Sequence, residues 1–301
     1  MKTSNSDQPR ELGKVSWFRD FDEAVAESAR SGKPVLLLFQ EVPGCSNCVD
    51  FGRNMLTHPL FVEAIENEFV PLAIFNNVEG ADKVVLQRFN EPAWNNPVVR
   101  FIRTDGADLV ARFEFSLSAI AFHMQMRKAI AASGREMPRY FELLAGELKI
   151  LSGTSQIAYY QTPCFWSGET SLIQHPMVLS TEAGWIAGEE VVKVHYDPEI
   201  GPLSELNRYA ADQQFSFIEG DDRSYRKDAE PQYYLKKSVF RFLPLGFTQR
   251  SWLNFAVAHN EDGKACLSPR QQQLLRMHAG DGGRGADVLY DRDMEDAWPW
   301  A

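Results

Sequence analysis

Residues 32–56 read GKPVLLLFQEVPGCSNCVDFGRNML. The apolar run 35–40 predicts a short buried strand, and the apolar spacing that follows predicts a helix beginning at or near the first cysteine. Cys45 and Cys48 therefore form a CxxC where a strand gives way to a helix. Backbone N–H groups and the helix dipole at that end favour the thiolate, which lowers the pKa of the exposed first cysteine. The pattern predicts dithiol redox chemistry, with Cys45 as the attacking sulfur and Cys48 as the resolving one.

Two other interpretations of the CxxC stay open, a structural zinc half-site and a pair of spare cysteines. Zinc takes four ligands, and the sequence contains no second CxxC and no HxxxH. We therefore expect no metal and no other cofactor. Two further cysteines, Cys164 and Cys266, complete a set of four, which is too few for a disulfide framework in 301 residues. We therefore favour a chemical role for these cysteines over a structural one.

The composition disfavours several classes of partner. The formal net charge of −10 argues against binding to nucleic acid or to an anionic membrane, because both attract basic surfaces. The first residues have no apolar segment like that of a signal peptide, and the longest apolar run, 35–39, is too short to span a bilayer. We expect a cytoplasmic protein with small-molecule or protein partners.

The length favours two domains, and the first half has a mixed order of elements. The patterns predict an amphipathic helix, the strand and helix around the CxxC, a further helix and strand, a hairpin of two strands and a closing helix, at 17–34, 35–56, 59–77, 97–115 and 116–131. This order, with GKPVLLLF before the CxxC and FVPLAIFNN after it, resembles the thioredoxin superfamily over residues 15–134. A cis-proline faces the CxxC in that superfamily, and the resemblance implies that Pro97 has this place and contacts the substrate.

The second half carries a different group of motifs. CFWSGE begins at Cys164, and the strand-like segments VLSTEAGWI (178–186) and EVVKVHYDP (190–198) follow. In this order they resemble methionine sulfoxide reductase A over residues 155–280. The two resemblances imply a mixed α/β (α+β) protein, in which a thioredoxin-like fold precedes a ferredoxin-like α/β domain. A helical linker at 135–154 and an acidic tail at 281–301 complete the expected organisation.

The second resemblance also implies a site, that of a peptide-methionine (S)-S-oxide reductase-like enzyme. Reduction of a sulfoxide needs a thiolate at sulfur and an acid at oxygen, and Cys164 is expected to be the nucleophile that ends as a sulfenic acid. Phe165 and Trp166 are expected to hold the substrate methyl group. Glu190 is the expected acid, buried enough to stay protonated, although Glu189 beside it could take this place.

Several positions depart from the family pattern. Pro163 and Ser167 replace glycines that flank the family's cysteine, and the segment before the acidic strand, which carries a tyrosine that binds the sulfoxide oxygen, shrinks to IAGE. A second family tyrosine corresponds to Tyr225 or to Tyr234, and we take Tyr225 as the substrate-binding candidate.

A fused dithiol would raise the local concentration of reductant for Cys164. The expected relay runs from Cys48 and Cys45 to Cys164, with an oxidised sulfur substrate, small or protein, and an upstream electron donor such as a thioredoxin system as partners. Cys266 could resolve an intermediate, but a spare loop cysteine is favoured. Two alternatives stay open: a different substrate for the same enzyme, and a thiol–disulfide oxidoreductase whose C-terminal domain only binds a substrate or partner.

Overall fold

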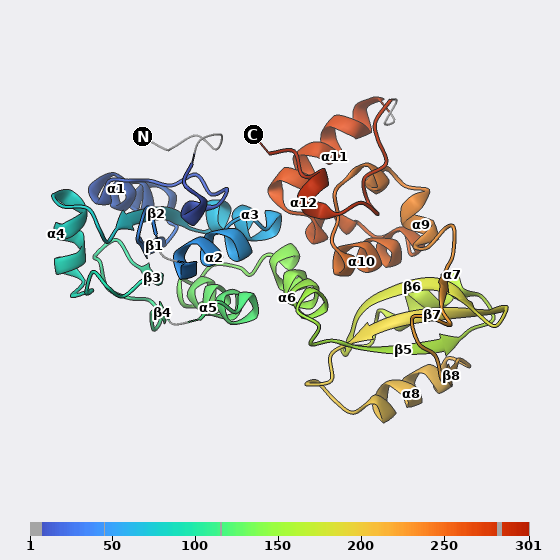
Figure 1. The fold of residues 1–301 in the computed structure, drawn as a ribbon. Coiled ribbons are helices and arrows are strands. Elements are labelled where there is room, and N and C mark those ends of the chain that lie inside the picture. Colours follow the sequence, from blue (N-terminus) through green and yellow to red (C-terminus); the bar gives the residue numbers. More distant parts are fainter. Residues whose placement is uncertain (1–7, 45, 115, 282–284, 301) are drawn as a thin grey trace. The chain divides into compact units, whose positions relative to one another are not determined.

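The computed structural model describes residues 8–44, 46–114, 116–281 and 285–300. The chain divides into two compact units, Met1–Met137 with Pro299–Ala301, and Pro138–Trp298. Their elements are labelled in Figure 1. No helix in the described part of the chain is both long and apolar enough to cross a membrane.

The first unit is a four-stranded sheet with helices between its strands. Its elements are η1 (Arg10–Leu12), α1 (Phe21–Ser31), β1 (Val35–Gln40), α2 (Ser46–Met55), α3 (Pro59–Glu68), β2 (Val70–Phe75), α4 (Ala81–Arg88), β3 (Val98–Ile102), β4 (Phe113–Glu114) and α5 (Ala119–Ala132). The strand order is β2-β1-β3-β4, with β1 and β2 parallel and the other pairs antiparallel. Helix α4 is an element that the sequence patterns did not predict.

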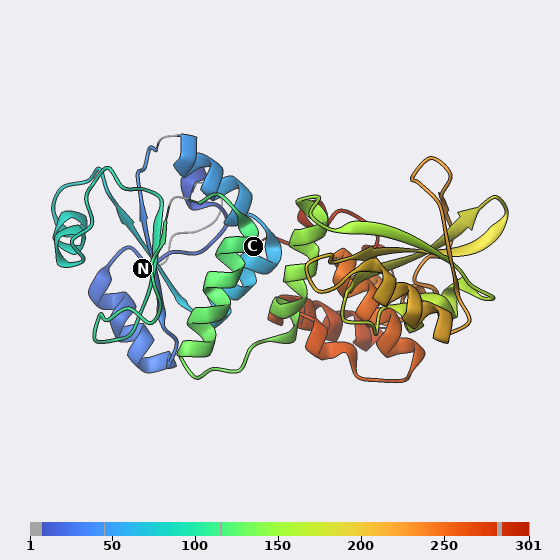
Figure 2. The same cartoon turned by 90° about the horizontal axis from the view of Figure 1, so that it is seen from below.

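Strand β1 is buried along its whole length because helices cover both faces of this sheet (Figure 2). Helices α1 and α4 pack on one face, where Phe21 and Val85 join the core. On the other face an aromatic cluster joins α2, α3 and α5, in which Phe51 and Phe61 both contact Phe122. The helices therefore hold β1 from both sides, which fixes the position of Gln40, its last residue.

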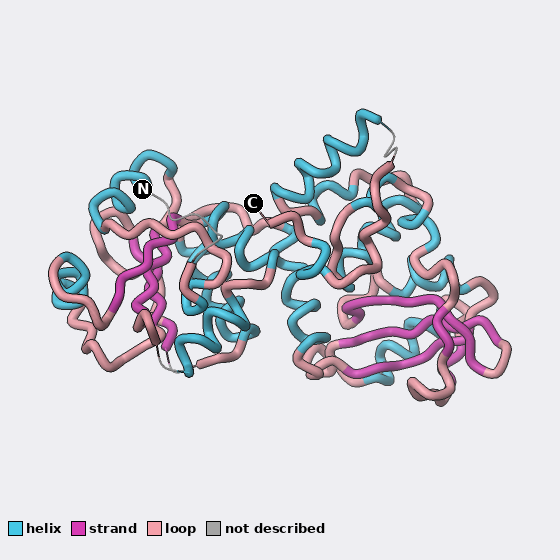
Figure 3. The backbone as a smooth tube through the Cα atoms, turned by 45° about the horizontal axis from the view of Figure 1, so that its top comes forward, coloured by secondary structure: helices cyan, strands magenta, loops and turns pink. Residues whose placement is uncertain are grey.

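The second unit is built on an antiparallel sheet of five strands (Figure 3). Its elements are α6 (Arg139–Leu151), β5 (Gln156–Gln161), α7 (Phe165–Leu172), β6 (Val178–Ile186), β7 (Glu189–Tyr196), α8 (Leu203–Asp212), β8 (Ser216–Ile218), β9 (Arg226–Lys227), α9 (Tyr233–Lys236), η2 (Val239–Phe242), α10 (Phe247–Ala258), η3 (Gly263–Cys266), α11 (Pro269–Asp281) and α12 (Met294–Ala297). The strand order is β8-β5-β7-β6-β9.

The run β5-α7-β6-β7-α8-β8 with strand order β8-β5-β7-β6 is the split βαβ, or ferredoxin-like, topology. Alternation along β7 divides its side chains between two faces. Val192 and Val194 lie in the core with Phe165 of α7 and Leu206 of α8, so both helices cover that face. Both units contain helices and sheets, which confirms the predicted mixed α/β class.

Two expected segments differ in the structure. Residues 139–151, expected to belong to a linker, form α6, which packs inside the second unit because Leu143 joins an apolar cluster with Leu253 of α10. Part of the expected tail also folds there. Tyr290 is buried in the same cluster, and its N–H donates to the carbonyl of Arg241 (3.1 Å). Burial of the Tyr290 ring therefore holds this part of the acidic, glycine-rich segment in the second unit.

The close fit of Gly184 against Tyr225 gives a test of this fold. A Cβ at position 184 would overlap the Tyr225 ring, whose hydroxyl donates to the Ala183 carbonyl (3.0 Å) and is thereby held in place. We expect Gly184→Ala to lower the free energy of unfolding of the second unit by about 1–3 kcal/mol, as overpacking does. Denaturant unfolding of the full chain measures this loss.

The matched control is the same substitution combined with Tyr225→Ala. If the overlap with the ring causes the loss, Gly184→Ala costs much less in the Tyr225→Ala background. An equal loss in both backgrounds would contradict the packing described here.

Candidate functional sites

The CxxC of the first unit lies between β1 and α2. Cys48 is buried on α2, and its Sγ donates to Oδ1 of Asn96 (2.8 Å). Its carbonyl accepts from Nε2 of Gln40, the last residue of β1 (3.0 Å). Cys45 directly precedes α2 and lies outside the described residues. The backbone of Cys48 is therefore tied to the central strand and its sulfur to the segment before β3.

Pro97 lies at this same place. The Asn96–Pro97 peptide bond is cis, as the superfamily resemblance implied. Because Asn96 accepts from Cys48, the structure brings Pro97 and Cys48 together. The substrate-binding role of Pro97 stays a prediction.

A buried acid, Glu11, also reaches the CxxC. Its Oε1 accepts from the N–H of Gly44, the residue before Cys45 (2.7 Å). Glu11 comes from the polar N-terminal segment, where no motif or periodicity marks it, and the sequence analysis missed it.

The second cysteine site lies between β5 and α7. Cys164 is the N-cap residue of α7 and is half-buried. The carbonyl of Glu190 accepts from the N–H of Thr162 (3.1 Å), and its carboxylate Oε2 accepts from the N–H of Phe165 (2.8 Å). Glu190 thus holds the chain on both sides of the Cys164 residue.

Glu190 and Glu189 have different surroundings at this site. Glu190 is half-buried, whereas Glu189 is exposed and its Oε2 accepts from Nε2 of Gln161 (3.0 Å). Adjacent residues of a strand point to opposite faces, and Glu190 shares the face of Val192 and α7. This geometry favours Glu190 as the candidate acid, and its role stays a prediction.

The aromatic residues near Cys164 have different surroundings. Phe165 is 4% exposed and belongs to the core. Trp166 is half-buried, and its ring stacks on Tyr233 with centroids 4.3 Å apart. Trp185, which pairs with Glu190 across β6 and β7, packs edge-on against Phe165 (5.2 Å). Its Nε1 donates to Asp228 (2.9 Å).

An open hollow of about 560 Å³ lies at this end of the sheet. We call it the sheet-end hollow, and its lining includes Pro163, Trp185, Glu189 and Glu190. Trp185 is the aromatic side chain in the lining of this hollow, which includes neither Cys164 nor Phe165 nor Trp166. The signal in the sequence was Trp185 itself, which stands in AGWI at the end of the predicted strand 178–186.

Tyr225 lies away from this site. Its ring contacts Tyr159 (5.6 Å between centroids) and lies beneath the ammonium of Lys193 (5.4 Å). Tyr159 and Lys193 pair across β5 and β7, in the register position next to Val192, so they lie on the opposite face of the sheet from Glu190. The structure does not bring Tyr225 to Cys164, which corrects the expected placement.

The comparisons with known proteins concern the first unit. A family model described as thioredoxin-like matches residues 16–105. Residues 16–105 form a thioredoxin-like domain. Among solved structures, the chain is similar to a DsbH oxidoreductase, with 18% identity over 43% of this chain and 94% of that chain and a TM-score of 0.35. It is also similar to a thioredoxin from Thermus thermophilus, with 21% identity, coverage of 40% and 91%, and a TM-score of 0.35. The comparison with curated proteins gives no match.

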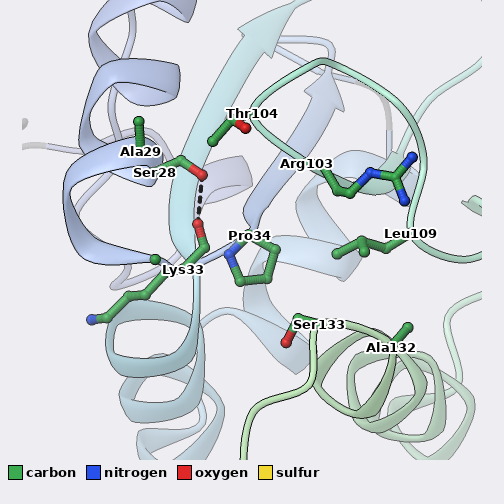
Figure 4. Close-up of a pocket in the computed structure, with 10 residues that line it drawn as sticks. Ser28, Ala29, Lys33, Pro34, Arg103, Thr104, Leu109, Ala132 and Ser133 are labelled. Carbon is green, nitrogen blue, oxygen red and sulfur yellow. Dashed lines mark hydrogen bonds between the residues drawn. The ribbon is translucent and has the colours of Figure 1, made fainter.

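A second cavity, of about 450 Å³, belongs to the same unit as the thioredoxin-like domain (Figure 4). Pro34, just before β1, and Arg103, just after β3, line it, whereas Cys48 follows the other end of β1. The Ser28 hydroxyl at its edge donates to the Lys33 carbonyl (2.5 Å) and closes the turn after α1. This cavity is not part of the redox site of the thioredoxin-like domain.

Cys266 of the second unit lies in a hydrophobic environment. It is 9% exposed, and burial raises the pKa of its thiol to about 11. It packs with Leu143 and Leu253, as expected for a spare cysteine that has become part of a core. Over the described residues no group of three or more histidine, cysteine and acidic side chains could hold a metal ion.

Glu169 anchors the helix that begins after Cys164. Its Oε1 accepts from the N–H groups of Ala183 (2.9 Å) and Gln232 (3.0 Å), so α7 is tied to β6 and to the start of α9. Complete burial raises the pKa of this carboxyl to about 8, against the opposing effect of these two hydrogen bonds. Glu147 of α6 behaves in the same way, since burial raises its pKa to about 7.

These raised values predict that the second unit loses stability as the pH rises from about 4.5 to about 8. Above its unfolded pKa of 4.5 the Glu169 carboxyl loses its proton in the unfolded chain but keeps it in the folded chain until about pH 8. The free energy of unfolding therefore falls as the pH rises through that window, with a slope of at most about 1.4 kcal/mol per pH unit for this group. We expect Glu169→Gln to reduce the slope, and Glu147 to supply what is left. Denaturant unfolding at several pH values measures it.

Glu189→Gln is the matched control, because Glu189 is exposed and should leave the slope unchanged. An equal slope in the wild type and in Glu169→Gln would show that Glu169 is ionised in the folded protein.

Proposed function

We propose that the protein is a thiol oxidoreductase in which Cys164 reduces a methionine sulfoxide or a related oxidised sulfur substrate. The thioredoxin-like domain with its CxxC supports a general thiol–disulfide oxidoreductase. For the second unit, the observation that carries the proposal is the contact of Glu190 with the chain on both sides of Cys164. This contact joins the Glu190 carboxylate to the residue after a half-buried cysteine at a helix N-terminus, and Pro163 and Glu190 line an open hollow.

Cys164 supplies the nucleophile. The sulfur of a sulfoxide carries partial positive charge, so a thiolate attacks it. The first turn of α7 presents backbone N–H groups and the positive end of the helix dipole at this position, and both stabilise negative charge.

Glu190 supplies the proton. In its protonated form the carboxyl donates to the sulfoxide oxygen while Oε2 keeps its bond from the Phe165 N–H. The attack forms a bond between the Cys164 sulfur and the substrate sulfur. As the protonated oxygen passes to Cys164, this bond and the bond between substrate sulfur and oxygen both break, and the electron pair stays on the substrate sulfur. The products are a thioether and a cysteine sulfenic acid, so the substrate is reduced by two electrons and the cysteine is oxidised by two.

Trp185 supplies the apolar surface for the substrate methyl group. It lines the hollow and lies opposite Glu190 in the strand register, so one side chain offers an aromatic face and the other a proton. Phe165 supports Trp185 from the core through its edge-on contact.

The CxxC returns Cys164 to the thiol. The thiol of Cys45 condenses with the sulfenic acid to give a Cys45–Cys164 disulfide and water, and the Cys48 thiol then attacks the Cys45 sulfur. This frees Cys164 and leaves a Cys45–Cys48 disulfide, which an upstream donor such as a thioredoxin system reduces. Attachment of the dithiol to the same chain raises its concentration near Cys164.

A second candidate function is a thiol–disulfide oxidoreductase whose second unit only binds a substrate or partner. The arrangement of Cys48, Asn96 and cis-Pro97 favours it, because these contacts lie entirely in the first unit.

The Cys164→Ser variant separates the two functions. We expect it to lose methionine formation from methionine sulfoxide down to background, because serine is not a redox-active nucleophile. We expect Glu190→Gln to lower kcat by about 100-fold or more, the usual effect of removing a general acid. Product is measured by chromatography, and a sulfenic-acid reagent should label position 164 in the wild type.

Cys266→Ser is the matched control, since it also removes a thiol of the second unit, and it should keep the wild-type rate. If Cys164→Ser retains activity while Cys48→Ser abolishes protein disulfide reduction, the second unit is a binding module and the sulfoxide reaction is wrong.

A further inference from the structure

A third cavity, of about 120 Å³, lies in the second unit on the face of the sheet opposite Glu190. Ser180 pairs with His195, and Glu182 pairs with Lys193, across β6 and β7, and all four residues line this space. We call it the β6–β7 cavity. Polar and charged side chains therefore gather on the face of the sheet that the cysteine site does not use.

A buried cation, Arg250 of α10, also lines this cavity and is 8% exposed. Its Nε donates to the carbonyl of Leu245 (3.0 Å) and its Nη2 to the carbonyl of Arg292 (2.9 Å). Within the described residues its Nη1 has no hydrogen-bond partner, and no carboxylate lies within ion-pair distance of the guanidinium. Burial lowers the pKa of this group, yet an arginine keeps its proton in a protein. Because buried charges are normally paired, Arg250 lacks the anion that such a group usually faces.

The carboxyls that act on this guanidinium through space leave its charge unpaired. Glu147 is completely buried, which raises its pKa to about 7, so much of it is protonated at neutral pH. Asp291 is exposed, where water screens its charge. Glu182 lines the cavity, but its Oε1 accepts from the Tyr225 hydroxyl (3.1 Å) and its Oε2 pairs with Lys227 (2.8 Å). An additional anion is therefore needed to pair the buried charge.

Other hydrogen-bond donors surround the same space. The Nδ1 of His195 shares a hydrogen bond with the Ser155 hydroxyl (3.1 Å), and when Nδ1 accepts, Nε2 carries the proton and is a donor. In the part of the chain that the structure describes, neither this Nε2 nor the hydroxyl of the buried Ser180 has a partner. The Lys193 ammonium pairs with Asp222 (2.5 Å), which uses one of its three protons. The lining thus offers several donors to one ligand.

The volume of the cavity limits the size of that ligand. A water molecule takes about 30 Å³ in the liquid, so 120 Å³ has room for about four waters or for an ion of roughly five non-hydrogen atoms, the size of inorganic phosphate. A guanidinium matches the oxygens of phosphates and carboxylates in geometry and charge. A small oxyanion therefore fits both the space and its donors.

We propose that the β6–β7 cavity binds a small oxyanion of the phosphate or carboxylate class, whose charge is met by Arg250 and whose oxygens accept from Ser180 and His195. Lys193 adds positive charge at the edge of the site. The anion joins β6 and β7 to α10 and stabilises the folded second unit, since it binds the folded chain alone. The site uses no residue of the proposed sulfoxide reaction and does not depend on it.

The test is a calorimetric titration of the full-length protein with sodium phosphate, and separately with sodium acetate, in a Tris chloride buffer at neutral pH. We expect one saturable site per chain and a midpoint of thermal unfolding that rises with anion concentration at constant ionic strength. We expect Arg250→Gln to raise Kd by about tenfold or more, as the loss of a charge-assisted contact does. His195→Gln should raise Kd by about two- to tenfold, as the loss of a neutral hydrogen bond does.

Arg276→Gln is the matched control. Arg276 is exposed on α11 and does not line the cavity, so the substitution removes the same charge and should leave Kd unchanged. Arg250 also holds the carbonyls of Leu245 and Arg292, so a thermal unfolding curve must show that Arg250→Gln folds. If it does not fold, His195→Gln decides the test, because this variant keeps those two bonds.

Each outcome supports or overturns the anion site. If neither phosphate nor acetate binds the wild type, the cavity is not an oxyanion site. If an anion binds but Kd is unchanged in the folded variants of Arg250 and His195, it binds elsewhere and the inference is wrong. A lower Kd for one of the two anions, lost in these variants, supports the site and identifies its class of ligand. Cys164→Ser should bind the anion as the wild type does, so failure of the sulfoxide reaction leaves this inference in place.

Discussion

The first turn of a helix leaves backbone N–H groups without partners inside the helix, and this constraint shapes both sites of the protein. In each unit a strand ends, a few residues follow, and a helix begins immediately after a cysteine, after Cys45 in the first unit and after Cys164 in the second. At Cys164 one of these N–H groups goes to Glu190. The bond that satisfies the backbone therefore also brings a glutamate side chain to the residue after the cysteine.

Buried carboxyls extend this principle to the rest of the second unit. Glu147 accepts from the N–H of Thr248 in the first turn of α10, and Glu169 accepts from the N–H of Gln232 at the start of α9. Each joins a helix start to another element, because its partner belongs to a different segment of the chain. The arrangement concentrates acidic groups in the interior of a protein that is already acidic, and burial raises the pKa of both carboxyls. Through these two residues the pH affects both the helix ends and the packing of the core.

The sequence predicted the local elements well where hydrophobic pattern decides them. The strand at 35–40 and the strand at 178–186 have the bounds that their apolar runs indicated. The sequence predicted less well on which face of the sheet a residue lies. Tyr225 precedes a two-residue strand, β9, that pairs with β6 far away in sequence, and only this pairing decides which face the tyrosine occupies. Helix α4 escaped prediction because it is only eight residues long and its buried apolar side chains, Val85 and Leu86, are adjacent and show no helical period.

The candidate site shows the same division between local pattern and long-range contact. The cysteine and the acidic strand were recognisable as motifs, but only the bond from the Phe165 N–H distinguishes Glu190 from its neighbour. Glu11 reaches the CxxC from a segment without any pattern, so its position depends on packing around Gly44. Trp185 was visible in the sequence, yet its role depends on Phe165 and Trp166 turning toward the core and toward Tyr233.

Strand alternation explains how two adjacent glutamates can have different surroundings. Residues 189 and 190 begin β7, and the pleat sends their side chains to opposite faces. Glu190 faces α7, where its carboxylate accepts the Phe165 N–H. Glu189 is exposed beside Gln161, whose amide donates to its carboxylate. A shift of one residue in the register of β7 would exchange these surroundings, so the pairing of Trp185 with Glu190 fixes which of the two carboxylates reaches the residue after Cys164.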